Sequence, residues 1–152
     1  MGDITPEELG KLLDDLLGDL PAEGAPMPPR AEVDIPPGTT VVDFATPQSV
    51  AVFGQPGIAQ DDPDWFAATV LNRVLGGGGF ESRLMTEVRE KRGLTYGVYS
   101  YLAPRDLAET YLGSVSSAND RIAEAIAVIR AEWAEAAAEG ITEEELEAAK
   151  TY

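Results

Sequence analysis

Residues 21–38 contain six prolines and two glycines, and this segment limits the fold more than any other feature of the sequence. Proline lacks a backbone N–H, and its ring obstructs the preceding helical turn, so the segment favours neither a helix nor a central strand. We therefore expect a terminal helix within residues 1–21, a proline-rich linker at 22–38, and a larger unit at 39–152. With 152 residues in all, one compact domain is expected.

The N-terminal segment is predicted to form one amphipathic helix. Thr5-Pro6-Glu7-Glu8 has the pattern of a capping box, with proline at the first helical position. The leucines that follow recur at helical spacing and predict a face packed in a core. They are Leu9, Leu12, Leu13, Leu16, Leu17 and Leu20. The stripe is too short to favour a coiled coil of several heptads.

The larger unit is predicted to be an α+β two-layer sandwich, a mainly antiparallel sheet with helices packed on one face. β-branched and aromatic runs predict strands in two adjacent pairs, and adjacent pairs favour antiparallel pairing. These strands are expected at 39–44 with 49–53, and at 96–103 with 108–116. Helices are predicted at 62–75 and 82–92, then from 122 to Gly140, and from Thr142 onward. Because the chain stops soon after the last helix begins, we expect this domain to be incomplete.

The charge and the missing residue types exclude several function classes. The chain has 27 acidic and 11 basic residues, a net charge of −16, which disfavours binding to nucleic acid or anionic membranes. It contains neither cysteine nor histidine. Thiolate nucleophiles, histidine-based triads and zinc sites built from His or Cys are therefore excluded. No metal site or other cofactor is expected within this chain.

A run of four glycines, Gly76-Gly77-Gly78-Gly79, precedes the helix predicted at 82–92. A phosphate-binding loop is disfavoured, because no Gly-Lys-Ser/Thr ending follows and a helix, not a strand, precedes the run. A flexible loop that lets two helices change direction accounts better for the pattern. Such a loop is compatible with a position beside a substrate cleft.

Arg89 is the basic residue that most needs an explanation. Residues 73–92 hold five basic and three acidic residues, and Arg83 and Lys91 each have Glu87 four positions away as a helical partner. Arg89 has no such partner, so it is solvated, paired with a distant segment, or held for a ligand. Tyr96 follows at the predicted start of a strand, where the residue taken alone is better explained as a half-buried aromatic. If both point into one cleft, a guanidinium and a phenol suit a carbonyl oxygen that gains negative charge.

Two further stretches carry a family resemblance. VLNRVLGGGGFESRL at residues 70–84, continuing as EVREKRGLTY at 87–96, resembles the pitrilysin/insulinase-type zinc metallopeptidases, which include the mitochondrial processing peptidases. GDITPEEL at residues 2–9 resembles the stretch that closes the first homologous half of such proteins. The resemblance covers nearly the whole chain. It implies that residues 1–21 finish the first half and that residues 39–152 form most of the second.

In that family two homologous halves close around a chamber, and one half carries an inverted zinc motif, His-x-x-Glu-His with a distal glutamate. The other half supplies an arginine and a tyrosine seven positions apart that contact the substrate near the scissile bond. The resemblance assigns these catalytic roles to Arg89 and Tyr96. It also implies a substrate loop made of Gly76, Gly77, Gly78, Gly79, Phe80, Ser82 and Arg83.

The expected function is the substrate-binding, non-zinc portion of a zinc metalloendopeptidase that acts on peptides. Because the chain has no histidine, it is not expected to hydrolyse peptides alone, and zinc is expected in the partner half, in the same chain or a separate subunit. The alternative is a non-catalytic assembly or peptide-holding subunit of the same family. The composition, rich in alanine and arginine, points to a bacterial source and leaves periplasm and cytoplasm both open.

Overall fold

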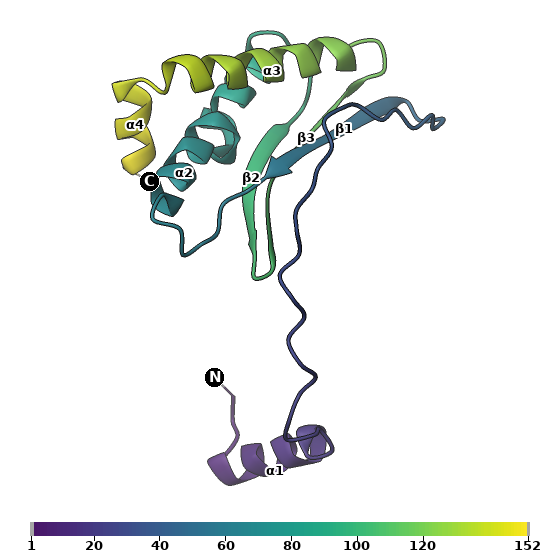
Figure 1. Ribbon diagram of the computed structural model, residues 1–152, viewed down its shortest axis with the longest axis vertical. Coiled ribbons are helices and arrows are strands. Elements are labelled where there is room, and N and C mark those ends of the chain that lie inside the picture. Colours follow the sequence, from purple (N-terminus) through teal and green to yellow (C-terminus); the bar gives the residue numbers. More distant parts are fainter. Residues whose placement is uncertain (1, 152) are drawn as a thin grey trace.

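The computed structural model describes residues 2–151, and its α+β architecture confirms the predicted fold class (Figure 1). The sheet consists of β1 (Gln48–Pro56), β2 (Val98–Arg105) and β3 (Ala108–Ala118). β3 lies in the centre, in the order β1-β3-β2, and both pairings are antiparallel. Helices pack on one face of the sheet, which leaves the other face open.

The helical segments are the α-helices α1 (Pro6–Leu17), α2 (Trp65–Asn72), α3 (Ile122–Glu139) and α4 (Glu143–Lys150), the π-helical turns η1 (Arg73–Gly77) and η3 (Met85–Glu90), and the 3-10 turn η2 (Gly79–Glu81). Both predicted capping boxes are present, at Thr5 with Glu8 and at Thr142 with Glu145. Gly140 ends α3 with φ of 81°. The helix predicted from residue 62 begins instead at Trp65. None of the helices in residues 2–151 is long and apolar enough to cross a membrane.

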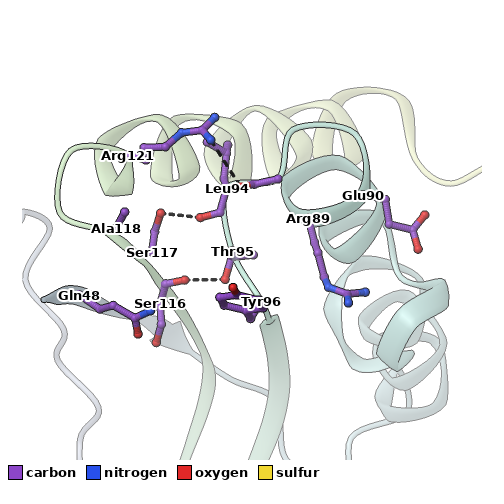
Figure 2. Close-up of a pocket in the computed structure, with 11 residues that line it drawn as sticks. Gln48, Arg89, Glu90, Leu94, Thr95, Tyr96, Ser116, Ser117, Ala118 and Arg121 are labelled. Atoms are coloured by element: carbon purple, nitrogen blue, oxygen red, sulfur yellow. Dashed lines mark hydrogen bonds between the residues drawn. The ribbon is translucent and has the colours of Figure 1, made fainter.

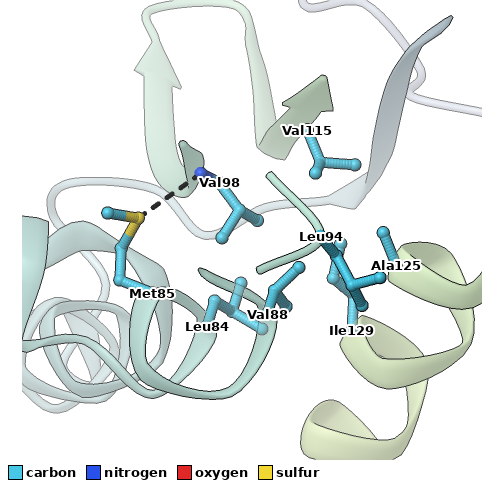
Figure 3. Close-up of a cluster of buried hydrophobic side chains, with 8 residues drawn as sticks. All are labelled: Leu84, Met85, Val88, Leu94, Val98, Val115, Ala125 and Ile129. Atoms are coloured by element: carbon cyan, nitrogen blue, oxygen red, sulfur yellow. Dashed lines mark hydrogen bonds between the residues drawn. The ribbon is translucent and has the colours of Figure 1, made fainter. Parts of the chain in front are cut away.

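The hydrophobic core lies where η3 and α3 meet the sheet (Figure 3). Its buried members are Leu84, Met85, Val88, Leu94, Val98, Val115, Ala125 and Ile129. Each large aliphatic side chain removed from water contributes roughly 1.5–3 kcal/mol to folding. The core therefore fixes η3 against the start of β2 and the end of β3, which is the part of the fold that carries Arg89 and Tyr96.

The strand predicted at residues 39–44 is wrong. This segment is extended but pairs with no strand among the described residues, and its Val41, Val42 and Phe44 are exposed. β1 pairs only with β3, through its whole length from Gln48 to Pro56. The β-branched residues favour an extended backbone, which this segment has. A strand also needs a neighbouring strand to pair with, and this segment has none among the described residues.

α1 begins and is capped as predicted, yet the expected burial of its leucine face is wrong for this chain. All six leucines from Leu9 to Leu20 are exposed. Figure 1 shows the reason, because α1 lies apart from the sheet and the other helices at the end of an extended linker. The linker itself has neither helix nor strand, as the prolines predict.

Candidate functional site

An open pocket of about 510 Å³ lies at the end of the sheet where β2 begins and β3 ends (Figure 2). Arg89 and Glu90 of η3 line one side, and Thr95 and Tyr96 come from the loop before β2. The remaining wall consists of Gln48, Gly93, Leu94, Ser116, Ser117, Ala118 and Arg121. The structure thus brings both residues of the predicted pair to one pocket, which we call the cleft.

Arg89 lies in the last turn of η3, where π-helical hydrogen bonding replaces the regular α-helical pattern. The N–H of Lys91 donates to the carbonyl of Thr86, five residues back, at 2.9 Å. Gly93 then ends the helical segment with φ of 58°, a left-handed conformation that favours glycine. The chain reverses there, so residues 94–96 run back beside η3. This local geometry explains how two residues seven positions apart reach the same cleft.

The Arg89 guanidinium lies over the ring of Phe80, with its central carbon 4.9 Å from the ring centroid. Within residues 2–151 Arg89 takes part in no ion pair, whereas its basic neighbours Lys91 and Arg92 both pair with Glu87, at 2.5 and 2.6 Å. The hydrogen bonds from these two side chains lower the pKa of Glu87. Glu87 is therefore held ionised by the neighbours of Arg89, and Arg89 lines the cleft without an ion-pair partner among residues 2–151.

Tyr96 belongs to the loop before β2 and not to the strand, so the predicted strand start at residue 96 is wrong by two residues. The hydroxyl of Thr95 anchors this loop: it lies 2.8 Å from the carbonyl oxygen of Gly97 and 2.5 Å from that of Ser116. The Tyr96 side chain itself is 87% exposed. Figure 2 shows it at the open side of the cleft, with Arg89 coming from the facing helical segment. A half-buried strand aromatic is excluded for this residue.

Arg121 closes the cleft at the side of α3. Its guanidinium donates to the carbonyl oxygens of Arg92 and Gly93, at 3.3 and 3.5 Å, and lies 3.6 Å from Glu124. These bonds tie the end of η3 to the start of α3. Gln48, Ser116 and Arg121 were not predicted from the sequence, because long-range contacts place them here. Strand pairing brings Gln48 and Ser116 to the cleft, and hydrogen bonds to the end of η3 bring Arg121.

The sequence predicts that Arg83 pairs with Glu87, and this prediction is wrong. Arg83 forms a bidentate ion pair with Glu145 of α4, in which Nη2 lies 2.7 Å from Oε2, and it also donates to the carbonyl of Gly140 at 3.3 Å. The hydrogen bonds from Arg83 are the main reason why the pKa of Glu145 falls to about 2. Glu87 is already occupied by Lys91 and Arg92, so the nearer helical partner is unavailable.

The sequence predicts that the glycine run forms a flexible loop, and this prediction is wrong. The run forms a series of packed helical turns. Gly76 is buried in η1, where an added Cβ would lie 2.3 Å from Oγ of Ser100. Gly79 has φ of 62° and begins η2. Ser82 is fully buried, and its hydroxyl donates to the carbonyl of Gly79 at 2.9 Å. Of the residues predicted to form a substrate loop, Phe80 is the one that contacts Arg89; the role of the set stays a prediction.

The residues present do not fit a zinc ion. The sequence has no His or Cys, and the structure places no three acidic side chains of residues 2–151 where they could share a metal. Zinc in proteins is bound chiefly by thiolate and imidazole, with carboxylates as additional ligands.

The fold and the cleft define an α+β domain with an arginine and a tyrosine at one open pocket and with no metal-binding group among residues 2–151. Comparison with known families shows that residues 1–152 match the family described as the Peptidase M16 inactive domain. The chain belongs to this peptidase family. Zinc in such proteins belongs to the partner half, since the domain matched here is the inactive one.

The relatives of this chain are bacterial and longer. An uncharacterized zinc protease of Streptomyces coelicolor is 37% identical over 80% of this chain and 26% of its own length. A protein of Helicobacter pylori named a non-peptidase homolog is 29% identical over 99% of this chain and 35% of its own length. The chain thus spans about a quarter to a third of these relatives.

Solved structures agree on the fold. The peptidase M16 inactive domain from Pseudomonas fluorescens superimposes with a TM-score of 0.74 at 32% identity, over 99% of this chain and 36% of that one. The periplasmic protease PqqL from Escherichia coli gives a TM-score of 0.60 at 20% identity, over 99% of this chain and 17% of that one. The second likeness concerns the fold only.

Proposed function

We propose that this chain is the substrate-binding, non-zinc portion of a zinc metallopeptidase, and that Arg89 and Tyr96 bind a carbonyl oxygen of a peptide. The observation that carries the proposal is that one open cleft holds both an arginine outside every ion pair of residues 2–151 and an exposed phenol. Family membership supports it, because relatives of this chain are named zinc proteases.

The chemistry of the pair suits a carbonyl. The Arg89 guanidinium presents several N–H donors and a fixed positive charge, and the Tyr96 hydroxyl presents one O–H donor. Donors directed at an oxygen that gains negative charge stabilise the transition state more than the ground state. The ring of Phe80 beneath the guanidinium orients it without neutralising it. This chain would thus bind and polarise the peptide carbonyl.

The test uses the protein assembled with its zinc-bearing partner half. Arg89→Ala and Tyr96→Phe are expected to lower kcat for a peptide substrate tenfold or more, because one such donor contributes roughly 3 kcal/mol. Arg89→Lys keeps the charge but loses the planar set of donors, so a smaller loss is expected. The matched control is Arg105→Ala, since this arginine lies outside the cleft at the far end of β2. Unchanged turnover in the Arg89 and Tyr96 variants, with normal thermal unfolding, would contradict the proposal.

A non-catalytic, peptide-holding subunit is the second candidate. The observation that favours it is the name of the Helicobacter pylori relative, a non-peptidase homolog that is similar over 99% of this chain. In that case the cleft binds peptide without turnover. Peptide binding that weakens in Arg89→Ala, together with undetectable hydrolysis by the assembled and zinc-loaded protein, would favour this candidate over the first.

A further inference from the structure

The face of the sheet opposite the helices carries a patch of apolar side chains. Side chains of a strand alternate between its two faces, and here the buried Val98 and Val115 lie beneath the helices. The residues between these helix-facing positions have side chains on the opposite face of the sheet, which we call the open sheet face. Its apolar members are Val50 and Val52 of β1, Tyr99 and Tyr101 of β2, and Leu112 of β3. All but Leu112 are exposed.

The antiparallel register arranges these side chains in rows across the strands. Ser114 lies between Val52 and Tyr99 in one row, and Leu112 lies beside Tyr101 in the next. The two tyrosine rings stack, with centroids 6.3 Å apart and an interplanar angle of 25°. Successive rows are two residues apart, about 6.6–6.8 Å. An extended peptide presents every second side chain at the same spacing, so one lying along the strands meets each row in turn.

The open sheet face is continuous with the cleft. Ser116 is the next residue of β3 on this face, opposite Val50, and it also lines the cleft together with Tyr96. The central strand thus carries two small hydroxyl side chains on this face: Ser114 lies between Val52 and Tyr99, and Ser116 lies beside Val50. None of these side chains is charged, in a chain of net charge −16. Apolar side walls with hydroxyl groups between them suit a peptide, whose backbone needs hydrogen-bonding partners.

We infer that the open sheet face binds alternate apolar side chains of an extended peptide whose carbonyl is held at Arg89 and Tyr96. The inference rests on the proposed function and adds the substrate class. These substrates are extended segments with aliphatic or aromatic side chains at every second position near the bound carbonyl. We expect a peptide with one apolar side chain at such a position to bind about tenfold more tightly than a peptide with a small polar residue there.

The experiment compares two labelled extended peptides that differ only at one of these alternate positions, where one has leucine and the other serine. Their binding is measured by fluorescence anisotropy on the assembled protein, with EDTA present so that neither peptide is cut. Val52→Asp introduces a charge into the open sheet face at a side chain that is 75% exposed, and Val41→Asp is the matched control, 87% exposed and outside the sheet. The wild-type protein and Val41→Asp are expected to bind the leucine peptide about tenfold more tightly. Val52→Asp is expected to reduce that ratio to about twofold or less.

The outcomes separate this inference from the proposed function. An unchanged ratio in Val52→Asp overturns the inference, and weaker binding of both peptides by Arg89→Ala then still supports the proposed function. A reduced ratio in Val52→Asp with unchanged binding by Arg89→Ala supports apolar binding at the sheet face, but it contradicts the proposed function and the placement of the carbonyl at Arg89 and Tyr96. If the partner half covers this face instead, Val52→Asp lowers the Tm of the assembled protein well below that of Val41→Asp, and this result also overturns the inference.

Discussion

Arg89 is left outside the ion pairs of residues 2–151 because the charged residues around it pair with one another. Glu87, two residues before Arg89, is shared by Lys91 and Arg92. Arg83, which could also have competed for Glu87, is held by Glu145. With these charges satisfied, Arg89 rests on Phe80 and faces the cleft. That Arg89 takes part in no ion pair of residues 2–151 therefore reflects the whole local network of charges.

Gly76 illustrates how closely the helical turns approach the sheet. An added Cβ would lie 2.3 Å from Oγ and 2.8 Å from the backbone nitrogen of Ser100. We expect Gly76→Ala to lower the free energy of unfolding by about 1–3 kcal/mol, because overpacking displaces β2. Urea denaturation monitored by circular dichroism measures the change. Gly24→Ala is the control, since nothing lies within 4 Å of its added Cβ. Equal stability of the two variants would contradict the close approach.

At the scale of elements, the ion pair between Arg83 and Glu145 attaches α4 to the start of the segment that carries η3. The pKa of Glu145 is lowered from 4.5 to about 2, so its ionised form is more stable in the folded state than in the unfolded one. The resulting stabilisation is present above about pH 4.5 and is lost as the pH falls toward 2. Because solvent still reaches both side chains, we expect it to contribute about 1 kcal/mol at neutral pH.

Glu145→Gln tests this attachment. The Tm of the variant is expected to lie below that of the wild-type protein at pH 6–7, and the difference should shrink steadily below pH 4.5 and disappear near pH 2. Glu147→Gln is the control, because that carboxylate pairs with Lys150 within the same exposed helix. A difference in Tm that stays constant from pH 7 to pH 3 would mean that Glu145 acts through packing and not through its charge.

Local sequence patterns predicted how several helical segments begin and end. Contacts between segments far apart in the sequence could not be predicted from such patterns. The capping boxes at Thr5 and Thr142 and the left-handed Gly93 are each determined within a few residues, and the structure has all three. The pairing of Arg83 with Glu145, across 62 residues, is set by where α4 packs, and no local pattern encodes it. For the same reason the site residue Ser116 could not be predicted, because only strand pairing brings it beside Tyr96.

For the whole molecule, the exposed leucine face of α1 is the largest departure from what the pattern predicts. Leucines at helical spacing normally face a core, yet here all six are exposed, and α1 lies apart from the sheet domain. That residues 1–21 finish the preceding homologous half remains a proposal. It explains why a face built for burial has no cover in residues 2–151, since the cover would belong to the other half.

The proposal leads to a comparison between the isolated chain and the protein assembled with its partner half. Replacing Leu13 and Leu16 by serine in the isolated chain is expected to change the free energy of unfolding by less than about 0.5 kcal/mol, because both side chains are already exposed. Leu84→Ala, in the core, is expected to cost about 2–5 kcal/mol in either context. In the assembled protein the double substitution should become costly as well, since it then removes two buried side chains. Differential scanning calorimetry of both forms decides the matter: a double substitution that is equally harmless in each would mean that α1 covers nothing in the other half.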